Sequence, residues 1–93
     1  MFKRNADVTL NFRDVGSGAP VLLIHGVGSD LESWEGVLSH LSPARRYIRY
    51  DQRGHGQSNR TPGPYSLNDL SNDAVALLDH LELDHVSVVG FSL

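Results

Sequence analysis

The 93-residue sequence is long enough for one small domain, and its composition, 40% hydrophobic and 20% charged, is that of an ordinary globular protein. A formal net charge of −3 provides no basic surface for nucleic acid or an acidic membrane, so we expect small-molecule partners and neither of those two. The absence of cysteine excludes disulfides and thiol chemistry, and it is consistent with the reducing cytoplasm, where we expect the protein to be located.

The N-terminal residues predict an antiparallel hairpin. Residues Val8 to Val15 alternate between apolar and polar side chains, which is typical of a strand with one solvated face. We expect Met1 to Arg4 to pair with this strand across a turn at Asn5 to Asp7. No apolar run follows the basic N-terminus, so we expect no signal peptide. The longest apolar run, Pro20 to Ile24, is far shorter than the ~20 residues of a transmembrane helix.

A first strand and crossover helix are predicted next. Val21 to Ile24 is continuously apolar, as in a central strand of a parallel sheet that is covered on both faces. After a glycine-containing turn, Ser29 and Glu32 match a capping box. Apolar residues then recur at helical spacing, namely Leu31, Trp34, Val37, Leu38 and Leu41. We expect this helix to end at Ser42-Pro43.

The second half of the chain repeats this pattern. Residues Arg46 to Tyr50 predict a strand, and Asp51 to Pro64 is rich in turn residues. Ser66 and Asp69 match a second capping box, and the following helix is expected to end near Glu82. Its apolar face is Leu67, Leu70, Ala74, Leu77, Leu78 and Leu81. Strands that alternate with helices of this length predict βαβ units and a right-handed, mostly parallel sheet.

Three predicted strands end in glycine-containing turns. The first is His25-Gly26-Val27-Gly28-Ser29, and the second is Asp51-Gln52-Arg53-Gly54-His55-Gly56-Gln57-Ser58. The last strand, Val86 to Phe91, leads into Gly90-Phe91-Ser92, the first half of the G-x-S-x-G pattern of a nucleophile elbow. In this order the turns resemble the N-terminal half of the α/β-hydrolase family, over about Val8 to Leu93.

The resemblance implies an α/β fold in which an antiparallel edge hairpin leads into a mostly parallel sheet with two crossover helices. Residues 1–93 would form an incomplete domain that stops at the nucleophile elbow. Ser92 corresponds to the nucleophile, and the backbone N–H groups of Val27 and Leu93 correspond to the oxyanion hole. In this family the acid and the histidine of the triad follow the nucleophile, so we expect them in a C-terminal half beyond Leu93.

Further residues are expected to support the site rather than to react. Gly26 and Gly28 would permit a tight turn and a close approach of the loop. His25 corresponds to a loop-orienting residue, and His55 is placed in the same supporting corner as the second turn. The complete supporting set is His25, Gly26, Gly28, Asp51, Arg53, Gly54 and Gly56, with His55 beside it.

Other site chemistries find little support in the sequence. The five histidines show neither H-x-H nor H-E-x-x-H spacing, so no metal site is expected. Gly54 to Asn59 follows a strand, but Asn59 replaces the third small residue of a dinucleotide loop and the next helix begins too late. No G-K-[ST] ending of a P-loop is present. The resemblance implies no cofactor.

The resemblance also narrows the substrate class. Three segments, Arg53 to Gly56, Pro62 to Leu67 and Ala76 to Leu81, are similar to the 3-oxoadipate enol-lactonase group. Phe91 before the serine also resembles the perhydrolase and aryl esterase group, and a carbon-carbon bond hydrolase of the same fold is a further alternative. A serine nucleophile argues against haloalkane dehalogenases and epoxide hydrolases, which use an aspartate.

The expected function is therefore hydrolysis of carboxylic esters or lactones by the full-length protein, with the 93 residues alone inactive. An alternative from another class is a non-catalytic α/β-hydrolase-like protein that binds a small molecule or a partner. The sequence leaves the substrate and the oligomeric state open.

Overall fold

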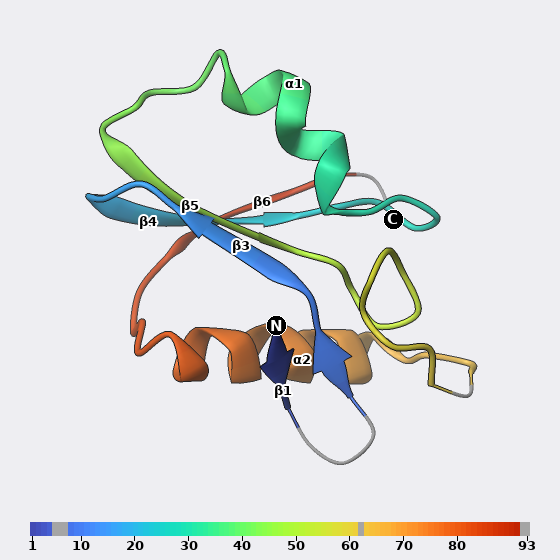
Figure 1. Cartoon of the computed structure of the whole chain (residues 1–93). Helices are drawn as coiled ribbons and strands as arrows, with labels where there is room; N and C mark the ends of the chain where they lie inside the picture. The colour runs from blue at the N-terminus through green and yellow to red at the C-terminus, as the bar shows by residue number, and fades with distance from the viewer. Residues whose placement is uncertain (5–7, 62, 92–93) are drawn as a thin grey trace.

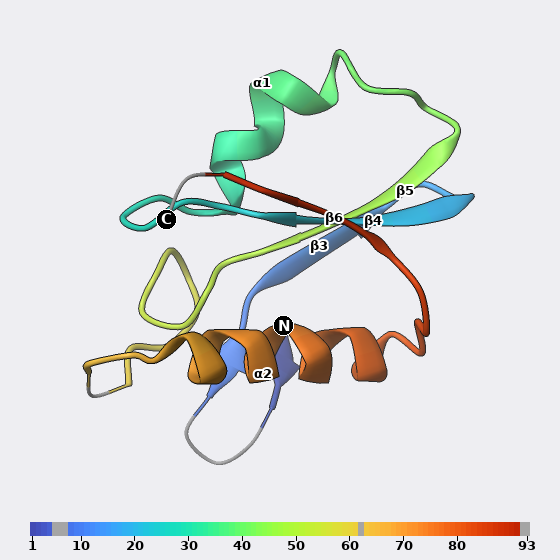
Figure 2. The same ribbon diagram turned by 180° about the vertical axis from the view of Figure 1, so that it is seen from behind.

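The computed structural model describes residues 1–4, 8–61 and 63–91. Its main sheet has the strand order β3-β5-β4-β6. Strand β4 (Ala19–Ile24) runs parallel to β5 (Arg45–Tyr50) and to β6 (Ser87–Gly90), and β3 (Phe12–Val15) pairs antiparallel with β5. Helices lie on both faces of this sheet, which gives three layers (Figures 1 and 2). The predicted α/β class with a mostly parallel sheet and an antiparallel edge is confirmed.

The N-terminal hairpin is present, but it forms a separate two-stranded sheet beside the last helix (Figure 1). In it, β1 (Phe2–Lys3) pairs antiparallel with β2 (Thr9–Leu10). The expected strand from Val8 to Val15 is thus divided at Asn11, whose backbone N–H donates to the Ser58 side chain (2.8 Å). The expected turn at residues 5–7 lies outside the described residues.

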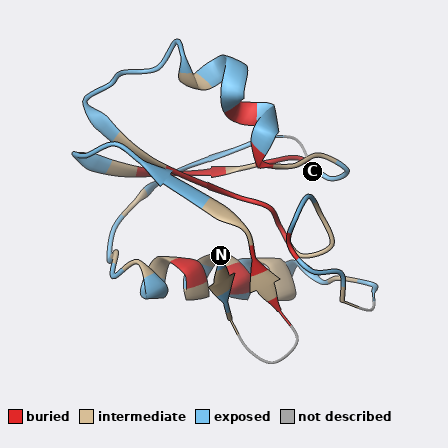
Figure 3. Cartoon of the chain, in the orientation of Figure 1, coloured by how far each residue is buried: buried red, intermediate tan, exposed pale blue. Residues whose placement is uncertain are grey.

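The core lies on both faces of the central strand β4. Leu22 packs on the face toward the last helix, and Leu23 packs on the opposite face. Figure 3 shows this buried strip through β4 and β5. The first cluster contains the buried residues Val8, Leu10, Leu22, Ile48, Tyr50 and Leu77, and the second contains Val21, Leu23 and Trp34. Neighbouring strand residues point to opposite faces, so the uninterrupted apolar run buries side chains in both clusters.

The first crossover helix is shorter than predicted. A 3-10 turn, η1 (Leu31–Trp34), leads into one turn of α-helix, α1 (Glu35–Leu38). The expected capping box at Ser29 is wrong, because the Ser29 N–H closes a turn with the Gly26 carbonyl (3.1 Å) and Asp30 caps η1 instead. Gly36 lies inside the expected helix and lowers its helical propensity, which is consistent with an end before the predicted Ser42.

The second helix, α2 (Leu67–His80), follows the sequence pattern more closely. Ser66 and Asp69 form the predicted capping box, with reciprocal hydrogen bonds of 3.0 and 3.1 Å. Leu77 is fully buried, but Leu67 is 70% exposed, so its expected place on the buried face is wrong. Periodicity sets the direction of the apolar face but not how far the sheet extends beneath it. Among the described residues, no helix has the length and apolarity needed to cross a membrane.

Candidate functional site

The predicted turns lie together at the carboxyl ends of the parallel strands. Because β4 and β5 are parallel, the turn after Ile24 and the loop after Tyr50 leave the sheet at the same edge, and the rings of His25 and His55 lie 5.0 Å apart. Strand β6 ends beside them, where the Phe91 N–H donates to the Ile24 carbonyl (3.0 Å). The predicted nucleophile Ser92 and the predicted oxyanion donor Leu93 lie outside the described residues.

Residues 26–29, which we call the Val27 turn, follow β4 and contain two exposed residues, Val27 and Gly28. The Val27 residue is 69% exposed, and its N–H donates to no residue that the structure describes. The next N–H, of Gly28, donates to His55 Nε2 (3.1 Å). Gly28 has φ +80°, and no described atom lies within 4 Å of the place of a Cβ, so glycine serves the backbone angle here rather than a close approach.

His25 is a buried, neutral ring with both nitrogens occupied. The Gln52 N–H donates to its Nε2 (3.0 Å), so Nε2 carries no proton and Nδ1 donates to the Gly26 carbonyl (2.7 Å). Burial lowers the pKa of His25 below its ordinary 6.5. In addition, the Gln52 side-chain amide donates to the His25 carbonyl (2.9 Å). These contacts leave no free nitrogen to act as a base, and the orienting role of His25 stays a prediction.

Asp51 connects the loop after β5 to the beginning of η1. Its buried carboxylate accepts from the Leu31 N–H (2.7 Å), from the Asn11 side-chain amide (2.9 Å) and from the Gln57 N–H (2.8 Å). Gly56 has φ +50°, and a Cβ there would lie 2.3 Å from the Asp51 carboxylate. Glycine is therefore required at position 56 for a steric and a conformational reason, while the supporting role of Asp51 stays a prediction.

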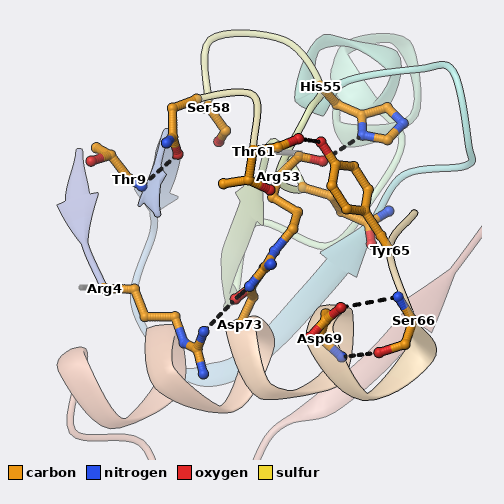
Figure 4. A network of polar contacts seen from close by, with 12 residues as sticks. Arg4, Thr9, Arg53, His55, Ser58, Thr61, Tyr65, Ser66, Asp69 and Asp73 are labelled. Atoms are coloured by element: carbon orange, nitrogen blue, oxygen red, sulfur yellow. Dashed lines mark hydrogen bonds and ion pairs between the residues drawn. The ribbon is translucent and has the colours of Figure 1, made fainter. Parts of the chain in front are cut away.

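Arg53 forms the most extensive ion pair of the loop. It donates to both oxygens of Asp73 on α2, at 2.6 and 2.7 Å, and Arg4 approaches the same carboxylate at 3.0 Å (Figure 4). The carboxylate of Asp73 raises the pKa of Arg53. Gly54, with φ +79°, brings the loop against the Tyr65 ring, which a Cβ would meet at 2.7 Å.

Asp73 is the supporting residue that sequence reasoning missed. It is 1% exposed and lies on the buried side of α2, three residues after Leu70 and four before Leu77. This helical spacing was a usable signal, because a carboxylate on an apolar face requires a buried partner. The partners themselves come from other elements of the fold.

A pocket of about 280 Å³ lies between the Val27 turn and the first helical segment. Its lining is mostly apolar, with Val27, Trp34, Val37 and Phe91 among its residues. An uncharged organic group would fit such a lining better than an ion would. In the described part of the chain, no group of three His, Cys, Asp or Glu residues is arranged to hold a metal ion.

Sequence comparison gives the relationship of the chain to known proteins. Residues 19–93 match the sequence model of the alpha/beta hydrolase fold family. The chain is 35% identical to 3-oxoadipate enol-lactonase 2 of Acinetobacter baylyi, over 94% of this chain and 33% of that protein. It is 38% identical to 2-(acetamidomethylene)succinate hydrolase of Mesorhizobium japonicum, over 92% of this chain and 31% of that protein. The chain spans about a fifth to a third of the length of the curated relatives it matches.

Solved structures of hydrolases are also similar to this chain. A hydrolase from Pseudomonas aeruginosa superposes with a TM-score of 0.92 at 36% identity, over 99% of this chain and 36% of that chain. The enol-lactonase of Burkholderia xenovorans gives a TM-score of 0.84 at 33% identity, over 89% of this chain and 34% of that chain. The strand order, the two glycine-containing turns and the match over residues 19–93 lead to one conclusion: this chain belongs to the α/β-hydrolase fold family.

Proposed function

We propose that residues 1–93 are the N-terminal part of a longer serine hydrolase that cleaves carboxylic esters or lactones. The observation that carries this proposal is the Val27 turn, in which the exposed residue Val27 has a backbone N–H without an acceptor among the described residues. This turn lies beside the end of β6, which ends two residues before Ser92. A backbone donor next to a strand that leads into Gly-Phe-Ser is the arrangement that acyl transfer requires. The relatives named as an enol-lactonase and as esterases support the same reaction class.

The proposed reaction begins with attack by the Ser92 hydroxyl on the substrate carbonyl carbon. The Val27 and Leu93 N–H groups stabilise the oxyanion, which collapses to an acyl-enzyme as the alkoxide leaves. A histidine takes the serine proton and returns it to the leaving oxygen, and water then releases the acid by the same route. His25 and His55 are unsuited to this work, because both rings already use both nitrogens.

A lactone or small ester is the substrate class that we favour. The pocket beside Val27 is apolar and small, so it suits a compact acyl group better than a long charged chain. A perhydrolase is the second candidate, since the chain is 35% identical to a putative non-heme chloroperoxidase of Synechocystis over 98% of its length and has a Phe before Ser92.

Ser92→Ala in the full-length protein tests the proposal. We expect this variant to lose turnover of p-nitrophenyl acetate and of a five-membered enol-lactone almost completely, by about a million-fold where the serine is the nucleophile. Ser87→Ala, on the exposed face of β6, is the matched control and is expected to retain activity. Near-normal activity of Ser92→Ala would overturn the nucleophile assignment. Substrate binding without turnover in the unsubstituted protein would favour a non-catalytic binding protein.

A further inference from the structure

A continuous series of polar contacts leads from helix α2 to the Val27 turn. It begins at Asp73, whose buried carboxylate is held by Arg53 through two parallel hydrogen bonds of 2.6 and 2.7 Å and by Arg4 at 3.0 Å (Figure 4). A bidentate pair fixes the orientation of a guanidinium group as well as its position. Because the carboxylate is almost inaccessible to water, this pair is screened far less than a surface ion pair.

The backbone carbonyl of Arg53 contacts the ring of His55, so the position of Arg53 affects that of His55. The Arg53 carbonyl lies 3.0 Å from His55 Nδ1, and the Gly28 N–H donates to His55 Nε2 at 3.1 Å. A backbone N–H only donates, so Nε2 is the acceptor and Nδ1 carries the proton that the Arg53 carbonyl accepts. The ring therefore links the loop after β5 to the Val27 turn in one defined tautomer.

The hydrogen bond from Gly28 to His55 also distinguishes two neighbouring backbone donors of the turn. The Gly28 N–H is occupied by His55, whereas the neighbouring Val27 N–H has no acceptor among the described residues. If His55 moved away, the Gly28 N–H would lose its acceptor, and the turn would lose the one hydrogen bond that joins it to the loop after β5 among the described residues. Gly28, which is next to Val27, is thus held by a ring that is itself held from outside the turn.

We propose that Asp73 is a positioning residue for the Val27 turn and acts through Arg53 and His55. Its catalytic consequence rests on the proposed function, in which the Val27 N–H stabilises an oxyanion. Asp73 touches neither the substrate nor the turn. It immobilises Arg53, the Arg53 carbonyl orients His55, and His55 holds Gly28 next to Val27. Loss of the Asp73 charge is expected to make the Val27 turn more mobile without changing the residues that line the pocket beside Val27.

The test uses Asp73→Asn in the full-length protein, with Asp79→Asn on the exposed side of the same helix as the control. Hydrogen exchange of the Gly28 amide is measured relative to the core amide of Leu22, together with kcat and KM for p-nitrophenyl acetate. We expect Asp73→Asn to speed Gly28 exchange by about tenfold and to lower kcat by about ten- to a hundredfold at similar KM, because small displacements of catalytic groups have effects of this size. Asp79→Asn is expected to change neither quantity.

A second variant keeps the proposal testable if Asp73→Asn does not fold. Arg53→Lys retains a positive charge opposite Asp73 but lacks the planar fork, so it should also speed Gly28 exchange. His55→Phe should do the same, and adding Asp73→Asn to it should cause no further loss, because contacts in series are not additive. Unchanged Gly28 exchange in a folded Asp73→Asn or Arg53→Lys protein would overturn the proposal, as would fully additive losses.

The two proposals fail differently. Absence of Ser92-dependent turnover in the unsubstituted protein would reject the proposed function, while Gly28 exchange in Asp73→Asn would still show whether α2 holds the turn. Faster Gly28 exchange with unchanged kcat and KM, in a protein with Ser92-dependent turnover, would reject the positioning role of Asp73 in catalysis.

Discussion

At the scale of single residues, Gly28 and Gly56 are required for different physical reasons. Gly56 faces the Asp51 carboxylate, which a Cβ would approach to 2.3 Å, whereas Gly28 faces open space among the described residues and is needed only for its φ of +80°. A side chain at position 56 is therefore disfavoured by packing and backbone strain together, and one at position 28 by backbone strain alone. The sequence motif shows two similar glycines and does not distinguish these reasons.

Substitution of the two glycines should separate these effects. We expect Gly56→Ala to lower the free energy of unfolding of the full-length protein by about 2–4 kcal/mol, because overpacking adds to the strain of a positive φ. Gly28→Ala should cost only the strain, about 1–2 kcal/mol. Urea-induced unfolding followed by tryptophan fluorescence measures both. Equal losses would show that the contact with Asp51 relaxes freely.

His25 makes a pH-dependent contribution to stability. Its pKa is lowered below 6.5 in the folded state, mainly by burial, while the unfolded chain regains the ordinary value. Between these two values the unfolded state binds more protons, so the stabilisation is complete above pH 6.5 and is lost as the pH falls below 6.5. We expect the free energy of unfolding to decline below pH 6.5, by at most about 1.4 kcal/mol per pH unit from this group.

The variant His25→Gln should remove this part of the acid sensitivity. Unfolding is measured in urea at several pH values from neutral to mildly acidic, with His40→Gln, at an exposed position, as the control. An unchanged pH dependence in His25→Gln would mean that other groups cause the acid sensitivity.

At the scale of elements, local signals account for α2 and fail for the first helix. The capping box at Ser66 is made within four consecutive residues, so the sequence alone contains both partners. The beginning of η1 has a local cap in Asp30, which accepts from the Glu32 N–H, and a second acceptor in Asp51, which accepts from the Leu31 N–H and comes from the loop after β5. The contribution of the distant Asp51 is not visible in a local pattern.

Removal of the cap of α2 should give a moderate loss of stability. In Ser66→Ala the Asp69 N–H loses its side-chain acceptor, and such caps contribute about 1 kcal/mol. Ser71→Ala, at an exposed position within the same helix, should be neutral or slightly stabilising because alanine favours the helix. Comparison of the two urea midpoints tests this. A loss of similar size in Ser71→Ala would contradict the capping explanation.

At the scale of the whole molecule, the two edges of the main sheet differ. Strand β3 forms one edge and carries the charged residues Arg13 and Asp14, whereas β6 forms the other edge, carries no charge and is exposed along its whole length. Two apolar pockets, of about 320 and 280 Å³, adjoin β6 on its two faces and include Val89 and Val88 respectively. An open strand edge with apolar side chains is a template for pairing with other chains.

We therefore expect residues 1–93, expressed alone, to self-associate and to show no ester hydrolysis above background. Val89→Lys on β6 should lower light scattering, since a charge on an edge strand opposes pairing. Val15→Lys, at a 62% exposed position of β3, is the matched control and should have little effect. A monomeric species that unfolds cooperatively and shows Ser92-dependent turnover would contradict both expectations and require a base among the five histidines.

The sequence by itself determined the features that depend on neighbouring residues. The apolar run of β4, the capping box of α2 and the glycine-containing turns were all predictable, because alternation, capping and positive φ are local properties. These signals were sufficient to predict the fold class and to place the candidate site at the carboxyl ends of the parallel strands. They also placed Arg53 and His55 in a supporting loop, without their partners.

The tertiary structure decided which distant groups meet. The Arg53 ion pair with Asp73 joins residues 20 positions apart, and the Gly28 hydrogen bond to His55 joins residues 27 positions apart. Strand order and register bring these groups together, and burial makes the pairing of Asp73 obligatory, since an unpartnered charge in the interior is costly. The tautomer of His25 and the pairing of the Gly28 N–H with His55 follow from the tertiary structure rather than from any sequence pattern.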